Sequence, residues 1–180
     1  MKKEFIKLSA ILCLITLVAG LLLAGVNSIT APAIEQAEKK ASEEAMKKIL
    51  PEADNFLKLN ENVALAKKGE ESVGFSAKVV TTGYGGDIVM MVGIDLQGAV
   101  QGIEILSHSE TAGLGAKIAN DDFKRQFRNK SPFAEVVKNK TDSADEITAV
   151  TGATISSRAV AKGLEEAAKL IVEALKEGLK

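Results

Sequence analysis

The sequence predicts an α+β protein, in which a single N-terminal transmembrane helix precedes a domain with an antiparallel sheet and a long C-terminal helix. Three observations carry this prediction. An uncharged apolar run lies near the N-terminus, short apolar segments alternate with turn residues in the middle, and the C-terminal segment has helical periodicity. The length of 180 residues fits one domain with an appendage.

The apolar run covers residues 8–29 and contains no charged side chain. A helix needs about 20 apolar residues to cross a bilayer, so this run is long enough. Lysines stand before it at positions 2, 3 and 7, and no basic residue follows until Lys39. The positive-inside rule then predicts a single-pass protein of the cell (inner) membrane, with a cytoplasmic N-terminus and an extracytoplasmic domain.

A cleaved signal peptide is the alternative for this segment, because residues 31–33 (Ala-Pro-Ala) have the small-x-small form of a cleavage site. Pro32 fits such a site poorly, and the apolar run exceeds the usual apolar core of a signal peptide. We therefore expect a retained anchor.

The chain is expected to divide into a cytoplasmic tip with the membrane anchor (1–30), a linker helix (31–55) and a globular domain (56–180). Helical spacing of alanine and isoleucine predicts a helix over residues 33–50, which Pro51 ends.

Short strands joined by tight turns predict an antiparallel meander in the globular domain. The predicted strands are residues 63–67, 75–81, 87–94 and 100–106. After them we expect a loop over 107–115, a short helix over 121–127, a surface loop over 138–146, a short strand over 147–150 and a final helix over 156–179.

The composition excludes several classes of function. One cysteine and one histidine cannot form an internal disulfide, a Cys/His metal cluster or a four-cysteine iron–sulfur centre. A formal net charge of −1, no tryptophan and one tyrosine give no nucleic-acid footprint. His108 is the chain's one histidine, and no sequence motif pairs it with a nucleophile and an orienting group. We therefore predict no catalytic residue and expect a cofactor to supply the chemistry.

The most informative motif is Thr-Gly-Ala-Thr at residues 151–154, followed by Ser156 and Ser157. It lies where an apolar run meets the final helical pattern. The first amides of a helix are unpaired and carry partial positive charge, and small residues let a ligand approach the backbone. The motif therefore indicates a phosphate site; a simple helix N-cap is the alternative.

Two further motifs accompany it: H-S-E-T-A-G-L-G at residues 108–115 and G-Y-G-G-D-I at residues 83–88. With these three motifs in this order and an N-terminal anchor, the chain resembles the FMN-binding domain family, and within it the G subunits of Rnf-type electron-transport complexes. It departs from the family pattern at Ala112, where proline is usual, and at Thr148, where an acidic residue is frequent.

The resemblance implies that FMN is attached covalently through a phosphoester to Thr154. It implies phosphate contacts from Thr151, Gly152, Ala153, Ser156 and Ser157. It also implies contacts of Glu110 and Thr111 with polar atoms of the flavin, an apolar ring contact from Leu114, a cofactor contact from the turn at Gly113, and Lys117 as a phosphate or ring partner.

At the level of function, the resemblance implies a membrane-anchored FMN electron carrier. It would be one redox subunit of a complex that passes electrons between ferredoxin and NAD, coupled to ion translocation, and not a complete enzyme alone. Its partners would be the other membrane subunits and a flavin transferase that uses FAD and Mg²⁺. The alternatives are the C subunit of a sodium-pumping NADH:quinone reductase and a flavin-free extracytoplasmic binding or scaffold domain.

Overall fold

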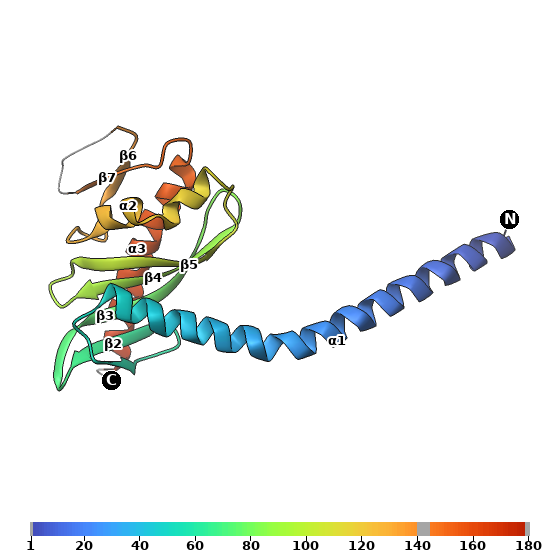
Figure 1. Ribbon diagram of the computed structural model, residues 1–180, viewed down its shortest axis with the longest axis horizontal. Coiled ribbons are helices and arrows are strands. Elements are labelled where there is room, and N and C mark those ends of the chain that lie inside the picture. Colours follow the sequence, from blue (N-terminus) through green and yellow to red (C-terminus); the bar gives the residue numbers. More distant parts are fainter. Residues whose placement is uncertain (1, 140–144, 179–180) are drawn as a thin grey trace. The chain divides into compact units, whose positions relative to one another are not determined.

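The computed structural model describes residues 2–139 and 145–178 (Figure 1). The chain forms two compact units, Met1–Ala41 and Ser42–Lys180. The first unit consists of the greater part of helix α1 (Lys2–Ile49), and the second contains the last turns of α1 and all the other elements.

Within the first unit, residues 8–29 of α1 carry no charged side chain on any side of the helix. From Ile6 onward it is long and apolar enough to cross a membrane, with a mean hydropathy of 2.5 over its most apolar window, although a signal sequence has the same properties. Its polar side chains bond within the helix: the Thr16 hydroxyl donates to the Leu12 carbonyl at 3.1 Å, and the Thr30 hydroxyl to the Val26 carbonyl at 3.0 Å. Such internal pairing is what a helix in lipid requires, because no water is present to pair these groups.

The apolar run and the predicted linker helix form one continuous helix instead of two. Pro32 lies inside it and does not end it. The reason is that a proline removes one backbone hydrogen bond and commonly kinks a helix without breaking it, when both flanks favour helix.

The second unit is built on a five-stranded sheet in the order β1-β2-β3-β4-β5, and all neighbouring strands are antiparallel. Its strands are β1 (Asn55–Lys58), β2 (Val63–Lys68), β3 (Glu71–Thr82), β4 (Asp87–Asp95) and β5 (Val100–His108). The predicted meander is confirmed. The sequence patterns did not indicate β1, which has four residues and is largely exposed.

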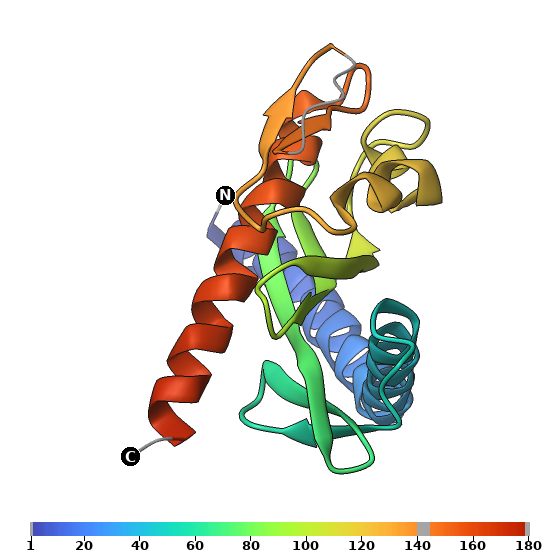
Figure 2. The same cartoon turned by 90° about the vertical axis from the view of Figure 1, so that its left-hand side faces the viewer.

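Helix α3 (Thr154–Gly178) lies along one face of this sheet (Figure 2). Its buried side chains include Val160, Leu164 and Ile171, which pack with Val79 and Met90 of the sheet. The amphipathic spacing of α3 explains this packing, because its apolar residues recur at three- and four-residue intervals. The final helix was predicted from residue 156; it begins two residues earlier, and Leu179 lies outside the described residues.

The opposite face of the sheet is covered by the last turns of α1 (Figure 2). Ala45, Ile49 and Leu50 pack there against Ala66 and Met91. The sheet is therefore covered on both faces, which agrees with the nearly continuous burial of the residues of β4.

The segment after β5 forms three short turns of helix: η1 (Gly115–Ala119), α2 (Asp121–Lys124) and η2 (Arg125–Phe127). The single short helix predicted over 121–127 is thus an α-helical turn followed by a 3₁₀ turn. Phe123 and Phe127 are both buried and meet edge to face, with ring centroids 5.2 Å apart. These rings anchor the segment in the core.

Lys124 is the buried charged residue of this segment. Its ammonium lies 2.9 Å from a Glu104 carboxylate oxygen and 3.1 Å from one of Asp121. Burial alone lowers the pKa of Lys124, but the bonds to Glu104 and Asp121 outweigh it, so this pKa lies above its usual value. Glu104 also pairs with Lys48 at 2.9 Å and so joins β5 to the last turn of α1.

A parallel pair, β6 (Glu135–Val137) and β7 (Glu146–Thr148), leads into the Thr-Gly-Ala-Thr motif. The strand predicted over 147–150 corresponds to β7, which ends earlier. The predicted loop over 138–146 lies partly outside the described residues, because 140–144 are not among them.

Candidate flavin site

The Thr-Gly-Ala-Thr segment turns sharply between β7 and α3. The Ala153 amide donates to the Val150 carbonyl at 2.9 Å, and Gly152 has a φ of +79°, which side chains rarely adopt. The first bond into the helix runs from the Ser157 amide to the Ala153 carbonyl at 3.0 Å. The amides of residues 154–156 precede this bond and have no acceptor within the helix, so they are available to an anion.

The two serines of this first turn are both buried and already bonded to protein groups. The Ser157 hydroxyl donates to the Ala153 carbonyl at 2.9 Å and accepts from the Val150 amide at 3.0 Å. The Ser156 hydroxyl donates to the Glu110 carboxylate at 2.9 Å. Because each hydroxyl has one proton, the first turn offers an anion its backbone amides and not these hydroxyl donors.

The end of β7 is held by the side-chain amide of Gln126. Its nitrogen donates to the Thr148 carbonyl at 3.2 Å, and its oxygen accepts from the Thr148 amide at 2.9 Å. Thr148 is where the family often has an acidic residue. Its backbone is thus fixed by Gln126 whatever side chain it carries, which holds the approach to the Thr-Gly-Ala-Thr turn.

The Glu110 carboxylate connects three segments at the base of the site. One oxygen accepts from the amides of Tyr84 at 2.7 Å and Gly85 at 3.3 Å, and the other accepts from Ser156. The amide of Glu110 in turn donates to Nδ1 of His108 at 3.2 Å. The three motifs of the sequence therefore meet at one buried side chain.

A cavity of about 340 Å³ opens above this contact. This volume lies within the range of small-molecule sites, which is about 300–1,000 Å³. Its lining residues come from all three motifs: Tyr84, Glu110, Thr111, Leu114, Gly115, Gly152, Ala153, Thr154, Ile155 and Ser156.

Three large apolar side chains around the cavity are exposed to solvent. Tyr84 is 73% exposed, Ile155 56% and Leu114 48%. A group of exposed apolar side chains beside unpaired amides fits a ligand with both an anionic and a planar apolar part, as FMN has.

Most of the predicted site residues line this cavity, but four do not. Ser157 is buried beneath the turn, Thr151 and Gly113 are exposed outside the lining, and Lys117 is exposed on η1. The predicted roles of all these residues remain predictions.

Sequence reasoning missed Tyr84 and Ile155 as lining residues. The available signal for Tyr84 was its position as the chain's one tyrosine within a glycine-rich motif.

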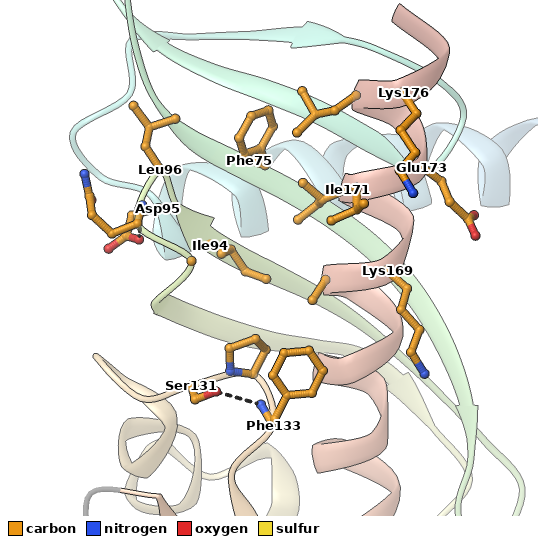
Figure 3. A pocket seen from close by; sticks show the side chains of 16 residues that line it. Phe75, Ile94, Asp95, Leu96, Ser131, Phe133, Lys169, Ile171, Glu173 and Lys176 are labelled. Carbon is orange, nitrogen blue, oxygen red and sulfur yellow. Dashed lines mark hydrogen bonds between the residues drawn. The ribbon is translucent and has the colours of Figure 1, made fainter. Parts of the chain in front are cut away.

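A larger cavity of about 650 Å³ lies between the β4–β5 turn and the C-terminal half of α3. Figure 3 shows Phe75, Ile94 and Ile171 facing this space, with Lys169 and Lys176 along the helix. None of its lining residues belongs to the three motifs, and the first turn of α3 is not among them. We therefore place the candidate site at the smaller cavity, where the free amides lie.

Family models and sequence relatives of this chain indicate the same protein family. Residues 83–169 match the FMN-binding domain family, and residues 1–49 match the RnfG N-terminal region. The G subunit of the proton-translocating ferredoxin:NAD(+) oxidoreductase complex of Clostridium ljungdahlii is 36% identical over 157 residues, which cover 86% of this chain and 84% of that protein. The chain belongs to this family of G subunits.

The G subunit of the Na(+)-translocating ferredoxin:NAD(+) oxidoreductase complex of Acetobacterium woodii is also 36% identical, over 185 residues that cover 90% of this chain and 89% of that protein. Membership of the family of Rnf-complex G subunits confirms the resemblance seen in the motifs. It also fits the use of the apolar part of α1 as a membrane anchor.

Two solved structures share the fold. The C subunit of the Na(+)-translocating NADH-quinone reductase from Parabacteroides distasonis has a TM-score of 0.54 and 24% identity, and the match covers 63% of this chain and 61% of that chain. NqrC of Shewanella oneidensis has a TM-score of 0.51 and 18% identity, covering 57% and 52%. At these identities the likeness concerns the fold, whereas the sequence relatives are G subunits, as predicted.

Within residues 2–139 and 145–178, no group of three or more His, Cys, Asp or Glu side chains is placed to hold a metal ion.

Proposed function

We propose that the chain is a membrane-anchored carrier of FMN, bound through a phosphoester to the hydroxyl of Thr154. The observation that supports it most strongly is the position of Thr154: it begins α3 and lines the cavity in which residues of all three motifs meet. Membership of the FMN-binding domain family supports the choice of FMN.

The residues of the cavity fit the parts of this cofactor. The amides of residues 154–156 and the partial positive charge at the start of α3 would hold the phosphate. Gly152 leaves room there, because a Cβ at this position would lie 3.2 Å from Cδ2 of Leu114. Tyr84, Leu114 and Ile155 would contact the ring, and Thr111 lies exposed among the lining residues for the ribityl hydroxyls.

When bound, the flavin accepts or donates electrons, and the protein sets its position and environment. The names of the relatives indicate the reaction: complexes that join ferredoxin to NAD(+) with translocation of protons or Na(+). In this proposal the chain relays electrons within such a complex, beside other membrane subunits, and does not complete the reaction alone.

A second enzyme has to attach the cofactor. Among the residues that line the cavity, no side chains form the kind of site that could cleave a nucleotide such as FAD. We infer a flavin transferase that uses FAD and Mg²⁺. The Thr154 oxygen would form the bond to the FMN phosphorus as its hydroxyl proton is released to solvent, the pyrophosphate bond of FAD would break, and AMP would leave. A permanent bond suits a domain outside the cytoplasm, where FMN lost by dissociation could not be replaced from the cytoplasmic pool.

The test is co-expression of the full chain with a flavin transferase, followed by intact-mass spectrometry. The parent chain should gain the mass of one FMN less one water. Thr154→Ala should lose this adduct, and Thr154→Ser should keep it because a hydroxyl remains.

Thr82→Ala is the matched control, since Thr82 is an exposed threonine outside the three motifs and outside the cavity lining, and it should leave the adduct in place. An adduct that survives Thr154→Ala, or that disappears with Thr82→Ala alone, would show that the attachment residue is misassigned. A parent chain without any adduct would favour the flavin-free scaffold.

A further inference from the structure

Glu110 is a buried carboxylate whose bonding partners are distant in sequence. Its residue is 8% exposed. The Tyr84 amide, 26 residues before it, and the Ser156 hydroxyl, 46 residues after it, both donate to its oxygens. Among the described residues, no Lys or Arg nitrogen forms an ion pair with it. The partners of its oxygens are therefore hydrogen-bond donors and not a counter-ion.

These donors include an anion-binding turn. Gly83 and Gly86 close the β3–β4 turn with a bond from the Gly83 amide to the Gly86 carbonyl at 2.8 Å. The two amides between them, of Tyr84 and Gly85, both point at the same Glu110 oxygen. Successive amides of this kind form a nest for an anion. Here the protein's own carboxylate fills the nest, so this turn is not a second phosphate site.

Two glycines keep the space that the carboxylate occupies. A Cβ at Gly83 would collide with a Glu110 carboxylate oxygen, and so would a Cβ at Gly115. The same Cβ at Gly115 would lie 3.0 Å from the Ser156 hydroxyl oxygen. Since these glycines come from two different loops, the packing around the carboxylate depends on several segments at once.

The mechanical consequence concerns Tyr84. Its side chain is exposed among the lining residues of the flavin cavity, so side-chain packing does little to hold it. Its backbone is held by the bond to Glu110, and Glu110 is held in turn by Ser156 on the first turn of α3. The position of Tyr84 relative to Thr154 is thus set through one carboxylate.

We propose that Glu110 is a positioning residue, which ties the β3–β4 turn to the first turn of α3 and so holds Tyr84 at the cavity beside Thr154. Three protein donors bond its two oxygens, and this is the bonding by which it acts through Tyr84. The inference deepens the proposed function and rests on it for the identity of the ligand.

The first test measures amide hydrogen exchange at Tyr84 and Gly85 in the full chain, purified from cells without a flavin transferase. Glu110→Ala should accelerate exchange at both amides by about fivefold or more, because it leaves both amides without an acceptor, and an unsatisfied donor costs at least that factor. Glu110→Gln should stay close to the parent, since its oxygen can accept from both amides and its NH₂ can donate to Ser156.

Unchanged exchange in Glu110→Ala would overturn the proposal. So would equally fast exchange in Glu110→Gln, which would show that charge and not hydrogen-bond geometry matters. Since no flavin is present, neither result depends on modification of Thr154, and failure here is distinct from failure of the attachment test.

Should Glu110→Ala not fold, Ser156→Ala tests the same connection from the other side. It should accelerate exchange at Tyr84 and Gly85, whereas Ser157→Ala is the matched control, because Ser157 bonds Val150 and Ala153 and not Glu110. Equal exchange at these two amides in both serine variants would contradict the proposal.

The second test uses the flavinylated chain. Contact with an aromatic ring quenches flavin fluorescence, so Tyr84→Ala should increase the emission, and Glu110→Ala should increase it similarly. The double variant should show no further increase, because both changes remove the same contact. Additive increases would show that Glu110 acts on the flavin independently of Tyr84 and would overturn the proposal.

Discussion

Gly152 has no side chain, which leaves space for both a ligand and the Leu114 side chain at the turn before α3. Its φ of +79° lies in the left-handed region, and a Cβ there would stand 3.2 Å from Cδ2 of Leu114. An alanine at this position therefore meets two penalties, one in the backbone and one in the cavity.

We predict that Gly152→Ala lowers the free energy of unfolding by about 1–2 kcal/mol, the usual cost of a left-handed non-glycine residue. It should also slow FMN attachment, because Leu114 is displaced toward the cavity. Chemical unfolding and the time course of the mass adduct measure the two effects.

Gly98→Ala is the matched control for this prediction. Gly98 has a φ of +88° but open space around its Cβ position, far from the motifs in the β4–β5 turn. It should cost a similar free energy and leave attachment unchanged. Equal attachment rates in the two variants would contradict the role given to Gly152.

At the same scale, the sequence predicted much of the cavity lining. The motifs identified Thr154, Gly152 and Leu114, which all line it. They did not identify Tyr84 or Ile155, because exposure at a cavity depends on how distant segments pack. The sequence also could not predict where the hydroxyls of Ser156 and Ser157 point. They donate to the Glu110 carboxylate and the Ala153 carbonyl, and these bonds form only in the folded chain.

Among the elements, the contact between the end of α1 and the sheet depends on two glycines. Gly93 of β4 and Gly102 of β5 face each other in register. A Cβ at Gly102 would lie 3.2 Å from Cα of Ile49, and one at Gly93 would lie 3.0 Å from Cγ of Leu50. The absence of side chains lets the helix backbone lie close to the strands.

We predict that Gly102→Ala destabilises the domain by about 1–3 kcal/mol, the usual cost of overpacking, because its neighbour is a backbone atom that cannot rotate away. Gly93→Ala should cost less, since its neighbours are side-chain carbons that can change rotamer. Thermal unfolding of the full chain in detergent measures both, and a larger loss for Gly93→Ala would contradict this account.

The elements that sequence patterns recovered are those with long apolar runs. Strands β2 to β5 and helix α3 were predicted within a few residues. Strands β1 and β6 were missed, because they are short, partly exposed and stabilised by their partner strands instead of their own apolar content. Helix α1 was divided at Pro32, where the favourable helical flanks outweigh one lost hydrogen bond.

For the whole molecule, the proposed orientation can be tested with single cysteines. The chain has one native cysteine, Cys13, so a Cys13→Ser background makes each added thiol unique. Lys162 is exposed on α3, and Lys3 precedes the apolar run.

In intact spheroplasts, a membrane-impermeant maleimide should label Lys162→Cys, because the domain is proposed to lie outside the cytoplasm. Lys3→Cys should be labelled only after the membrane is permeabilised. The opposite pattern of labelling would reverse the orientation and remove the proposed reason for a covalent link.

The sequence by itself determined the class of the protein: a charge-free run long enough for a bilayer, a strand-rich domain with a closing helix, and three motifs of a flavin-binding family. Periodicity and motif spacing are local properties, so the chain carries them without being folded. Only the tertiary structure decided that Glu110 joins the three motifs and that Tyr84 and Thr154 line the same cavity. It also decided that the end of α1 packs against the paired glycines of β4 and β5. Those contacts join residues tens of positions apart, and their geometry follows from strand register and packing.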